Sequence, residues 1–329
     1  MGDGVPVIDV GPLVSGAGDV DSVARAIDAA CRQAGFFSIV GHGVDPALQT
    51  RLDRLSRQFF ARPTPEKAEI AMARGGRAWR GWFPVGGELT SGVPDRKEGI
   101  YFGEELGAND PRVRARLPLH GPNLFPAHPA GLRDAVLEYI GAVTGVGHRL
   151  LRGVSRALGL EDDWFDHHLT AAPTILFRIF RYPPLPADVR DWSVGEHTDY
   201  GLLTILAQDA HGGLEVRGPD GWVAAPPVPG AFVVNLGDML ERMTGGRYRS
   251  TPHRVRNTGA ADRLSMPLFL DPAWDADVRP VPGAADEERA HDTDRWDGAS
   301  VHEWSGTYGD YLFAKVARVF PALVDDVIA

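Results

Sequence analysis

Four short apolar runs separated by turns most constrain how this chain can fold. The runs are Leu202–Leu206, Leu214–Arg217, Trp222–Ala225 and Ala231–Leu236. The segments between them, HGG, GPDG and PPVPG, are rich in the glycine and proline residues that end regular structure and form turns. This spacing predicts a meandering or jelly-roll sheet, in which segments far apart in the sequence lie side by side.

Three potential metal ligands flank these runs: His197 and Asp199 in GEHTDYG, and His253 in STPHRV. On a strand, side chains two residues apart project from the same face. The predicted sheet can bring His253 back to them across the 53 residues that follow Asp199. Two imidazoles and one carboxylate leave half of a coordination sphere open, which is typical of non-haem Fe(II) oxygenases. The His-x-Asp pair alone is weak evidence, because such pairs are common among ordinary polar residues.

A second signal follows His253 after nine intervening residues, where Arg263 and Ser265 begin the apolar segment RLSMPLFL. On a strand these two side chains share one face. A guanidinium can bind both oxygens of a carboxylate, and the hydroxyl adds a third donor. Inside an apolar barrel the pair therefore predicts a carboxylate receptor, whereas an arginine alone is more often paired with a structural acid.

These residues belong to a longer series of motifs, which reads RYPP, GEHTDYGLLTIL, GGLEV, NLGDML, TGGRYRSTPHRV and RLSMPLF in chain order. The series resembles the isopenicillin N synthase-like branch of the iron and 2-oxoglutarate-dependent dioxygenases. Near the N-terminus, VPVIDV and AGFFSIVGHGV resemble the N-terminal domain of that family. The family's usual Asn-His-Gly appears here as Gly41-His42-Gly43. The resemblance covers most of the chain.

The resemblance implies Fe(II) bound by the two histidines and the aspartate, and 2-oxoglutarate as a cosubstrate. The C5 carboxylate of 2-oxoglutarate is expected on Arg263 and Ser265. Tyr182 occupies the position at which relatives place a tyrosine that helps to bind a carboxylate, and Arg181 is a weaker candidate for the same role.

The expected fold class is α+β, with a double-stranded β-helix (jelly-roll) core buttressed by helices and a helical N-terminal region. Residues 1–120 are expected to form the helical and mixed N-terminal region. Residues 121–329 are expected to form the jelly-roll core with its buttressing helices.

Apolar residues at three- and four-residue steps predict several helices. The expected helices are Val20–Ala34, ending at Gly35, then Pro46 to about Phe60, Leu132–Leu158 and Ser305–Val327. Thr64, followed by proline, is expected to cap a further helix. The resemblance implies that the C-terminal helix packs over the mouth of the barrel.

The segment Arg74–Gly103 contains too many glycine and aromatic residues for a regular helix. It resembles the loop and hairpin that cover the active-site mouth in the family. Residues expected to contact the substrate are Trp82, Phe83 and Glu88 from this segment, Arg178 from the first core strand and Phe269 after Arg263. Packing between domains is an equally good interpretation of the two aromatic residues, as is a structural ion pair for Arg178.

Composition excludes several other classes of protein. The formal net charge is −10 and the arginines are scattered, which argues against a nucleic-acid partner. Cys31 is the only cysteine, so neither an intrachain disulfide nor a cysteine-rich zinc site can form. No run of 18 apolar residues occurs, and the N-terminus lacks a basic segment followed by an apolar one. We expect a cytoplasmic protein, a monomer or weak homo-oligomer, with no membrane partner.

The expected activity couples decarboxylation of 2-oxoglutarate to succinate with O2-dependent oxidation of a small organic substrate, such as an amino acid, a peptide or a natural-product intermediate. Hydroxylation is favoured over halogenation, because the related radical halogenases replace the metal-binding carboxylate with a small residue and Asp199 is present.

Other interpretations stay open at this point. An oxidase similar to isopenicillin N synthase would place the substrate's own carboxylate on Arg263 and use no 2-oxoglutarate. The MTGG and STPH segments resemble the bacterial ethylene-forming enzyme, which fragments 2-oxoglutarate. A hydrolase could use the same triad to hold Zn(II), but it leaves Arg263 and Ser265 unexplained. A binding protein without catalytic activity would be expected to have lost a metal ligand.

Overall fold

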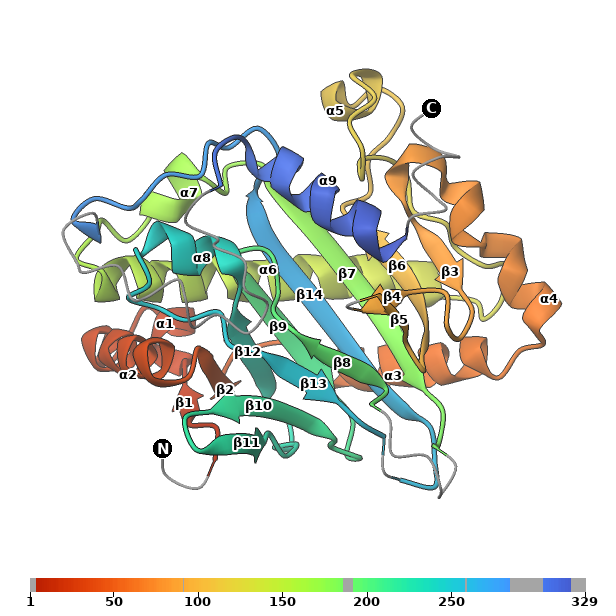
Figure 1. The fold of residues 1–329 in the computed structure, drawn as a ribbon, viewed down its shortest axis with the longest axis horizontal. Coiled ribbons are helices and arrows are strands. Elements are labelled where there is room, and N and C mark those ends of the chain that lie inside the picture. The colour runs from red at the N-terminus through yellow and green to blue at the C-terminus, as the bar shows by residue number, and fades with distance from the viewer. Residues whose placement is uncertain (1–3, 91, 186–191, 258, 285–303, 321–329) are drawn as a thin grey trace.

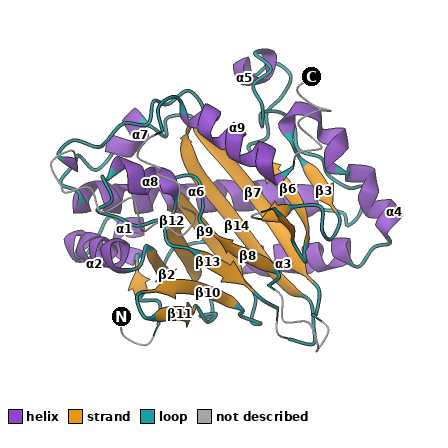
Figure 2. Cartoon of the chain, in the orientation of Figure 1, coloured by secondary structure: helices purple, strands orange, loops and turns teal. Residues whose placement is uncertain are grey.

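A computed structural model describes residues 4–90, 92–185, 192–257, 259–284 and 304–320. Two β-sheets form the centre of the molecule and helices surround them (Figures 1 and 2). This arrangement confirms the expected α+β class with a jelly-roll core. The N-terminal part of the chain joins the same hydrophobic core as the C-terminal part.

The larger sheet has eight strands, and only its edge pair β1 and β2 is parallel. Its order is β1 (Val7–Asp9), β2 (Phe36–Val40), β12 (Phe232–Leu236), β9 (Leu203–Gln208), β14 (Arg263–Ala273), β7 (Pro173–Tyr182), β6 (Glu98–Gly103) and β3 (Gly81–Phe83). Strands from the first 120 residues therefore occupy both edges of the sheet. The expected boundary near residue 120 stays a prediction.

The smaller sheet carries part of the candidate site. Its order is β11 (Gly221–Ala224), β10 (Leu214–Gly218), β13 (His253–Val255) and β8 (Val194–His197). A separate hairpin is formed by β4 (Leu89–Thr90) and β5 (Val93–Pro94). The four apolar runs of the sequence are strands β9 to β12, and their predicted bounds agree with the structure within two residues.

The four longer predicted helices are confirmed, except that the last one begins at Tyr308 rather than Ser305 and ends at Val319. They are α2 (Val20–Gln33), α3 (Pro46–Phe60), α6 (Leu132–Ala157) and α9 (Tyr308–Val319). The part of the C-terminal prediction from residue 321 onward lies outside the described residues. Short helices complete the fold: α1 (Gly11–Ser15), α4 (Thr64–Lys67), η1 (Ala68–Ile70), η2 (Met72–Ala78), α5 (Pro111–Arg114), α7 (Trp164–His168) and α8 (Asp238–Met243).

Two helix ends have the terminating or capping residues that their sequence favours, and one predicted helix cap is not observed. Gly35 follows the end of α2 with φ of +62°, and its N–H donates to the Ala30 carbonyl, as expected for a left-handed residue after a helix. Asp45 caps α3 by accepting from the Ala47 N–H. The cap predicted at Thr64 is wrong, because Thr64 is already helical and the cap position is Pro63, which forms no side-chain cap.

Helix α6 crosses behind the large sheet in Figure 1 and packs on β9 and β14. Gly147 permits this approach, because a Cβ atom placed there would lie 2.6 Å from Leu270 Cδ2 and 3.3 Å from Ile205 Cδ1. On the opposite side of the sheet, α9 contacts β14 and the β4 strand of the hairpin. The large sheet is thus buried on one face by α6, while α9 and the hairpin meet over its other face.

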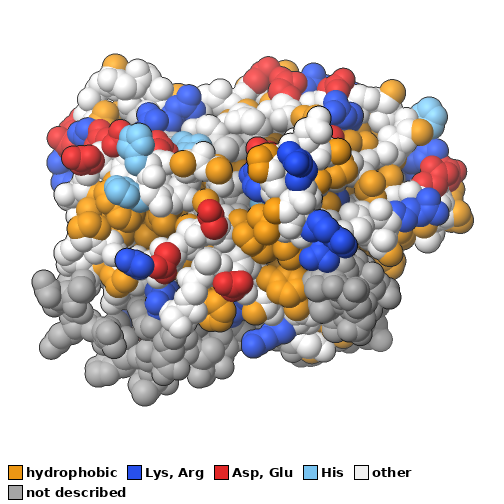
Figure 3. Space-filling view, turned by 90° about the horizontal axis from the view of Figure 1, so that it is seen from above, with side chains coloured by type: hydrophobic (Ala, Val, Ile, Leu, Met, Phe, Trp, Pro, Cys, Tyr) orange, Lys and Arg blue, Asp and Glu red, His pale blue; other side chains and the backbone are white. Residues whose placement is uncertain are grey.

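No helix among the described residues combines the length and apolar character needed to cross a membrane. On the face shown in Figure 3, acidic and basic side chains are interspersed rather than separated by sign.

Helix α6 offers a matched test of this packing. We expect Gly147→Leu to lower the free energy of unfolding by about 1–3 kcal/mol, because the added side chain overpacks the contact with Leu270 and Ile205. At Gly141, on the exposed side of the same helix, an added Cβ would have no atom within 4 Å. Gly141→Leu should therefore raise stability by up to about 1 kcal/mol through helix propensity. Urea denaturation of both variants measures the difference, and equal effects would contradict the packing argument.

Candidate active site

A pocket of about 440 Å³ lies between the two sheets. Alternate residues of the long neighbouring strands β7 and β14 line it, as the twofold periodicity of a strand requires. These residues are Leu176, Arg178, Phe180 and Tyr182 from β7, and Arg263, Ser265, Pro267, Phe269 and Asp271 from β14. The three candidate metal ligands line the same pocket.

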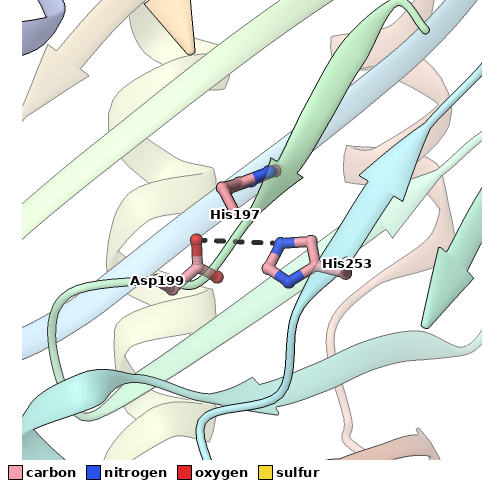
Figure 4. Close-up of side chains that lie close together, drawn as sticks. All are labelled: His197, Asp199 and His253. Atoms are coloured by element: carbon pink, nitrogen blue, oxygen red, sulfur yellow. Dashed lines mark ion pairs between the residues drawn. The ribbon is translucent and has the colours of Figure 1, made fainter. Parts of the chain in front are cut away.

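The two histidines are brought together by the small sheet. His197 is the last residue of β8, His253 is the first residue of β13, and the two are directly paired across the antiparallel ladder. Asp199 follows β8 and faces the same space (Figure 4). One ligand atom from each residue lies within 4.8 Å of the others, and His253 Nε2 is 3.8 Å from Asp199 Oδ1. The three groups are therefore grouped closely enough for one metal ion.

Backbone carbonyls orient both imidazoles. His197 Nδ1 lies 2.9 Å from the carbonyl oxygen of Gly195, and His253 Nδ1 lies 3.2 Å from that of Thr251. A proton on each Nδ1 satisfies these contacts and leaves Nε2 with its lone pair free to bind a metal.

The carboxylate of Asp199 is held by two side chains that the sequence analysis did not identify. Thr204 Oγ1 and Asn235 Nδ2 donate to Oδ2 at 2.5 and 2.6 Å, and Oδ1 remains directed toward His253. Both donors are isolated polar residues in apolar strand runs, LLTIL and AFVVNL. This pattern is the sequence signal that could have revealed them, because a buried polar side chain needs a partner.

The electrostatics favour the metal-binding protonation states. Burial lowers the pKa of His197, and burial together with the neighbouring His197 lowers that of His253 to about 4. Burial alone would raise the pKa of Asp199, but the two imidazoles and the hydrogen bonds from Asn235 and Thr204 outweigh it, so this pKa is lowered. At neutral pH the site offers two neutral imidazoles and one carboxylate, which is the form that binds a metal without first losing protons.

Arg263 has the features of an anion receptor. It is fully buried, and its Nε donates to the Gly212 carbonyl at 2.5 Å. Its two terminal nitrogens are buried and have no hydrogen-bond partner among the described residues. Because an unpaired buried cation is costly, the donor set fits a carboxylate ligand in the pocket.

Two of the residues predicted to bind the cosubstrate carboxylate lie beside Arg263, and one does not. Tyr182 lies opposite Arg263 in the ladder between β7 and β14, and its hydroxyl is 3.4 Å from Ser265 Oγ. Arg181 does not line the pocket, which corrects the expectation that it helps to bind the cosubstrate. As the neighbour of Tyr182 it projects from the other face of β7, where it pairs with Glu98 and Asp262.

Of the residues expected to contact the substrate, some line the pocket and others do not. Glu88, Arg178 and Phe269 line the pocket. Trp82 and Phe83 do not, which corrects their expected substrate role: Trp82 Nε1 donates to Glu98, and Phe83 packs against Tyr101 and Phe180. Sequence reasoning also missed other lining residues, among them Lys97, Tyr200, Asp271, Lys315 and Arg318, because nothing in the local sequence marks them.

A jelly-roll core that presents two histidines and one carboxylate beside a buried, unpaired arginine defines a non-haem iron oxygenase that uses a 2-oxo acid. Residues 5–128 match the family model described as the N-terminal part of the non-haem dioxygenase in morphine synthesis, and residues 173–272 match that of the 2OG-Fe(II) oxygenase superfamily. The chain belongs to the 2OG-Fe(II) oxygenase superfamily.

Curated relatives match over nearly the whole chain. A probable iron/ascorbate oxidoreductase of Dictyostelium discoideum is 45% identical, covering 93% of this chain and 91% of the relative. A 1-aminocyclopropane-1-carboxylate oxidase of the same organism is 34% identical, covering 97% and 96%. A homoarginine-6-hydroxylase of Oryza sativa subsp. japonica is 36% identical, covering 96% and 97%.

Solved structures support the same assignment. A Neurospora crassa protein in complex with alpha-KG and thymine has a TM-score of 0.80 at 25% identity, covering 96% of this chain and 98% of that chain. The dioxygenase for auxin oxidation in rice has a TM-score of 0.72 at 28% identity, covering 98% and 99%. The protein is an Fe(II)- and 2-oxoglutarate-dependent dioxygenase that oxidises a small organic molecule with O2.

The hydrogen bonds to Asp199 should contribute to metal affinity. Removing one of them by Thr204→Val or Asn235→Ala is expected to weaken Fe(II) binding by about 10–100-fold, because loss of a group that holds a metal ligand has effects of this size. Anaerobic metal titration measures the change. Thr174→Val is the control, since this buried hydroxyl has no hydrogen-bond partner among the described residues. Unchanged affinity in both test variants would contradict the role of these hydrogen bonds.

Asp271 gives the folded protein a specific pH dependence. Burial raises the pKa of this carboxyl to about 7, although the Tyr308 hydroxyl donates to it at 2.5 Å. A raised pKa in the folded state stabilises the fold at low pH, and this contribution is lost as the pH rises through about 7.

We therefore expect wild-type protein to lose about 3 kcal/mol more stability between pH 5 and pH 8 than Asp271→Asn, which stays neutral. Urea denaturation at the two pH values measures the difference. Asp134→Asn on the exposed side of α6 is the control, and parallel pH profiles for wild type and Asp271→Asn would contradict the expectation.

Proposed function

We propose that this protein hydroxylates its substrate, with Fe(II) bound by His197, Asp199 and His253. The single observation that carries the cosubstrate assignment is the unpartnered pair of terminal nitrogens on buried Arg263 among the described residues, in the pocket that the three ligands line. In this proposal Arg263 binds the C5 carboxylate of 2-oxoglutarate through both nitrogens, and Ser265 and Tyr182 donate further hydrogen bonds.

The iron centre supplies the oxidation: 2-oxoglutarate, O2 and a C–H bond give succinate, CO2 and an alcohol, with one oxygen atom in succinate and the other in the alcohol. The chain's own residues position the reactants. Thr204 and Asn235 hold the Asp199 carboxylate in place, and the two carbonyl contacts keep each Nε2 directed to the metal position. The carboxylate ligand supports hydroxylation rather than halogenation, since no ligand position is left for a halide.

The alternatives lead to different products in one assay. If the substrate's own carboxylate binds Arg263, O2 consumption needs no 2-oxoglutarate. Fragmentation of 2-oxoglutarate would release ethylene. A hydrolase would consume no O2 and would leave the Arg263 receptor without a purpose.

We also propose that the protein acts in the cytoplasm as a monomer or weak homo-oligomer, without a nucleic-acid or membrane partner. The single cysteine, Cys31, is buried and unpaired, and the net charge of −10 supports the absence of a nucleic-acid partner. A boundary near residue 120, between an N-terminal region and the jelly-roll core, is supported by family matches that end at residue 128 and begin again at residue 173.

Anaerobically reconstituted protein tests the proposed function. We expect Fe(II), 2-oxoglutarate and O2 to give slow succinate formation even without a prime substrate. Arg263→Gln should weaken 2-oxoglutarate binding by about 100-fold, because it leaves the ligand carboxylate without its charged partner.

The same Arg263→Gln variant should lose the preference for 2-oxoglutarate over 2-oxopentanoate, which lacks the C5 carboxylate. Arg181→Gln removes an equal charge from the outer face of β7 and should keep that preference. O2 uptake that is independent of 2-oxoglutarate, or a preference that survives in Arg263→Gln, would contradict the cosubstrate assignment.

A further inference from the structure

Arg178 forms a second cationic position in the pocket, separate from Arg263. It lies on β7 with its guanidinium carbon 4.1 Å from the centre of the Tyr101 ring and 4.7 Å from that of Phe269. Two aromatic faces therefore fix the guanidinium and shield it from water, and contacts of this kind stabilise a cation. Their geometry leaves the edge of the guanidinium, which carries the N–H groups, as the part available to a ligand.

The charged partner of Arg178 is only weakly engaged with it. Glu88 Oε1 lies 3.9 Å from Arg178 Nη1, beyond hydrogen-bonding distance. Glu88 instead accepts a hydrogen bond of 2.5 Å from the Tyr101 hydroxyl and pairs with Lys97 at 3.0 Å. Arg178 Nε is buried and has no hydrogen-bond partner among the described residues. The buried guanidinium thus keeps unused donor capacity, which favours binding of an anion.

This position is not part of the cosubstrate receptor. Arg263 lies opposite Tyr182 in the ladder, and Arg178 is four residues further along β7. At the rise of a β-strand the two positions are about 13 Å apart along the strand. The two guanidinium groups also lie over different rings, Tyr101 and Phe269 for Arg178 and Tyr182 for Arg263, so we treat them as two separate anion positions.

Basic side chains outnumber acidic ones in the remainder of the lining, although Lys97 pairs with Glu88 and Asp95 and Lys315 lies near Asp238. Beyond the metal ligands and Arg263, the charged lining residues are four basic side chains, Lys97, Arg178, Lys315 and Arg318, and two acidic ones, Glu88 and Asp271. Leu176, Phe269, Leu312 and Val319 supply apolar surface in the same pocket. A small molecule with a negative charge and a hydrocarbon body complements this combination.

We propose that the prime substrate is a small carboxylic acid whose carboxylate binds the edge of Arg178, with its hydrocarbon part in the apolar section of the pocket. This inference rests on the proposed function and names the substrate class for the same site. Both simple organic acids and α-amino acids carry the required group. For an α-amino acid, Glu88 and Asp271 are the lining carboxylates available to its ammonium group.

Binding to the anaerobic Fe(II) and 2-oxoglutarate complex tests the proposal without turnover. The probes are matched sets, each with a straight-chain or aryl carboxylic acid of four to twelve carbons, its primary amide and the corresponding α-amino acid. Calorimetry gives their dissociation constants, and substrate-stimulated succinate release in O2 gives a second readout. We expect acids to bind at least 10-fold more tightly than their amides. If the α-amino acids bind more tightly than the simple acids, the substrate is an α-amino acid. If the simple acids bind more tightly, the substrate is a simple organic acid.

Three variants assign the effect to Arg178. Arg178→Gln should weaken acid binding by about 100-fold and abolish the preference over amides, while 2-oxoglutarate binding stays within twofold of wild type. Arg178→Lys keeps the charge but not the two parallel hydrogen bonds, so it should recover part of the affinity. Arg181→Gln removes a charge from the opposite face of the same strand and should keep the wild-type preference. Thermal denaturation establishes that each variant is folded.

The outcomes separate this inference from the proposed function. Equal binding of acids and amides, or an acid preference that survives in Arg178→Gln, overturns the Arg178 proposal even when 2-oxoglutarate turnover is normal. Acid-selective binding that depends on Arg178, without any 2-oxoglutarate turnover, supports the Arg178 proposal and contradicts the proposed function instead.

Discussion

The antiparallel pairing of β13 with β8 is the interaction on which the metal centre depends. It places His253 directly opposite His197, although 55 residues separate them in the sequence. A shift of one residue in this register would turn one imidazole to the other face of the sheet and remove the site. The strands between them are short and antiparallel, so the length of each turn fixes which residues pair in the next strand. The turns at HGG and GPDG therefore contribute to metal binding through the register they impose.

The pocket contains buried cationic groups that the described part of the protein does not fully pair. Arg263 has two buried nitrogens without partners in the described part of the protein, and Arg178 has one. Such groups destabilise the folded chain until an anion binds, and ligands that bind only the folded state then return that stability. Binding of cosubstrate and substrate is therefore expected to raise the free energy of unfolding by pairing these buried charges. The aromatic rings around Arg178 reduce this cost without neutralising the charge.

Periodicity made much of this site predictable. A spacing of two residues placed Arg263 with Ser265 on one face of a strand, and the structure has both in the pocket. The same periodicity explains the error at Arg181, since adjacent residues on β7 face opposite sides and Tyr182 is the one that faces inward. Trp82 and Phe83 could not be assigned in this way, because their positions depend on how β3 packs against β6 and on contacts with Glu98, Tyr101 and Phe180. The partners of Asp199 come from two different strands, so no local pattern links Thr204 and Asn235 to it.

Different strands carry the metal ligands, the proposed cosubstrate receptor and the residues proposed to contact the substrate, which is how one fold can serve many substrates. The candidate metal ligands are on or beside β8 and β13, and the proposed cosubstrate receptor is on β14, so the proposed reaction constrains these positions. Arg178, Phe269 and the residues of α9 line the pocket without being needed for either task. If the proposal holds, substitutions at these positions should alter the substrate rather than the binding of iron or 2-oxoglutarate. Similar proteins carry names as different as homoarginine-6-hydroxylase and dioxygenase for auxin oxidation. On the proposal made for Arg178, the substrate is selected mainly by the inward face of β7 and the surfaces opposite it, where Arg178 keeps a buried donor without a partner among the described residues.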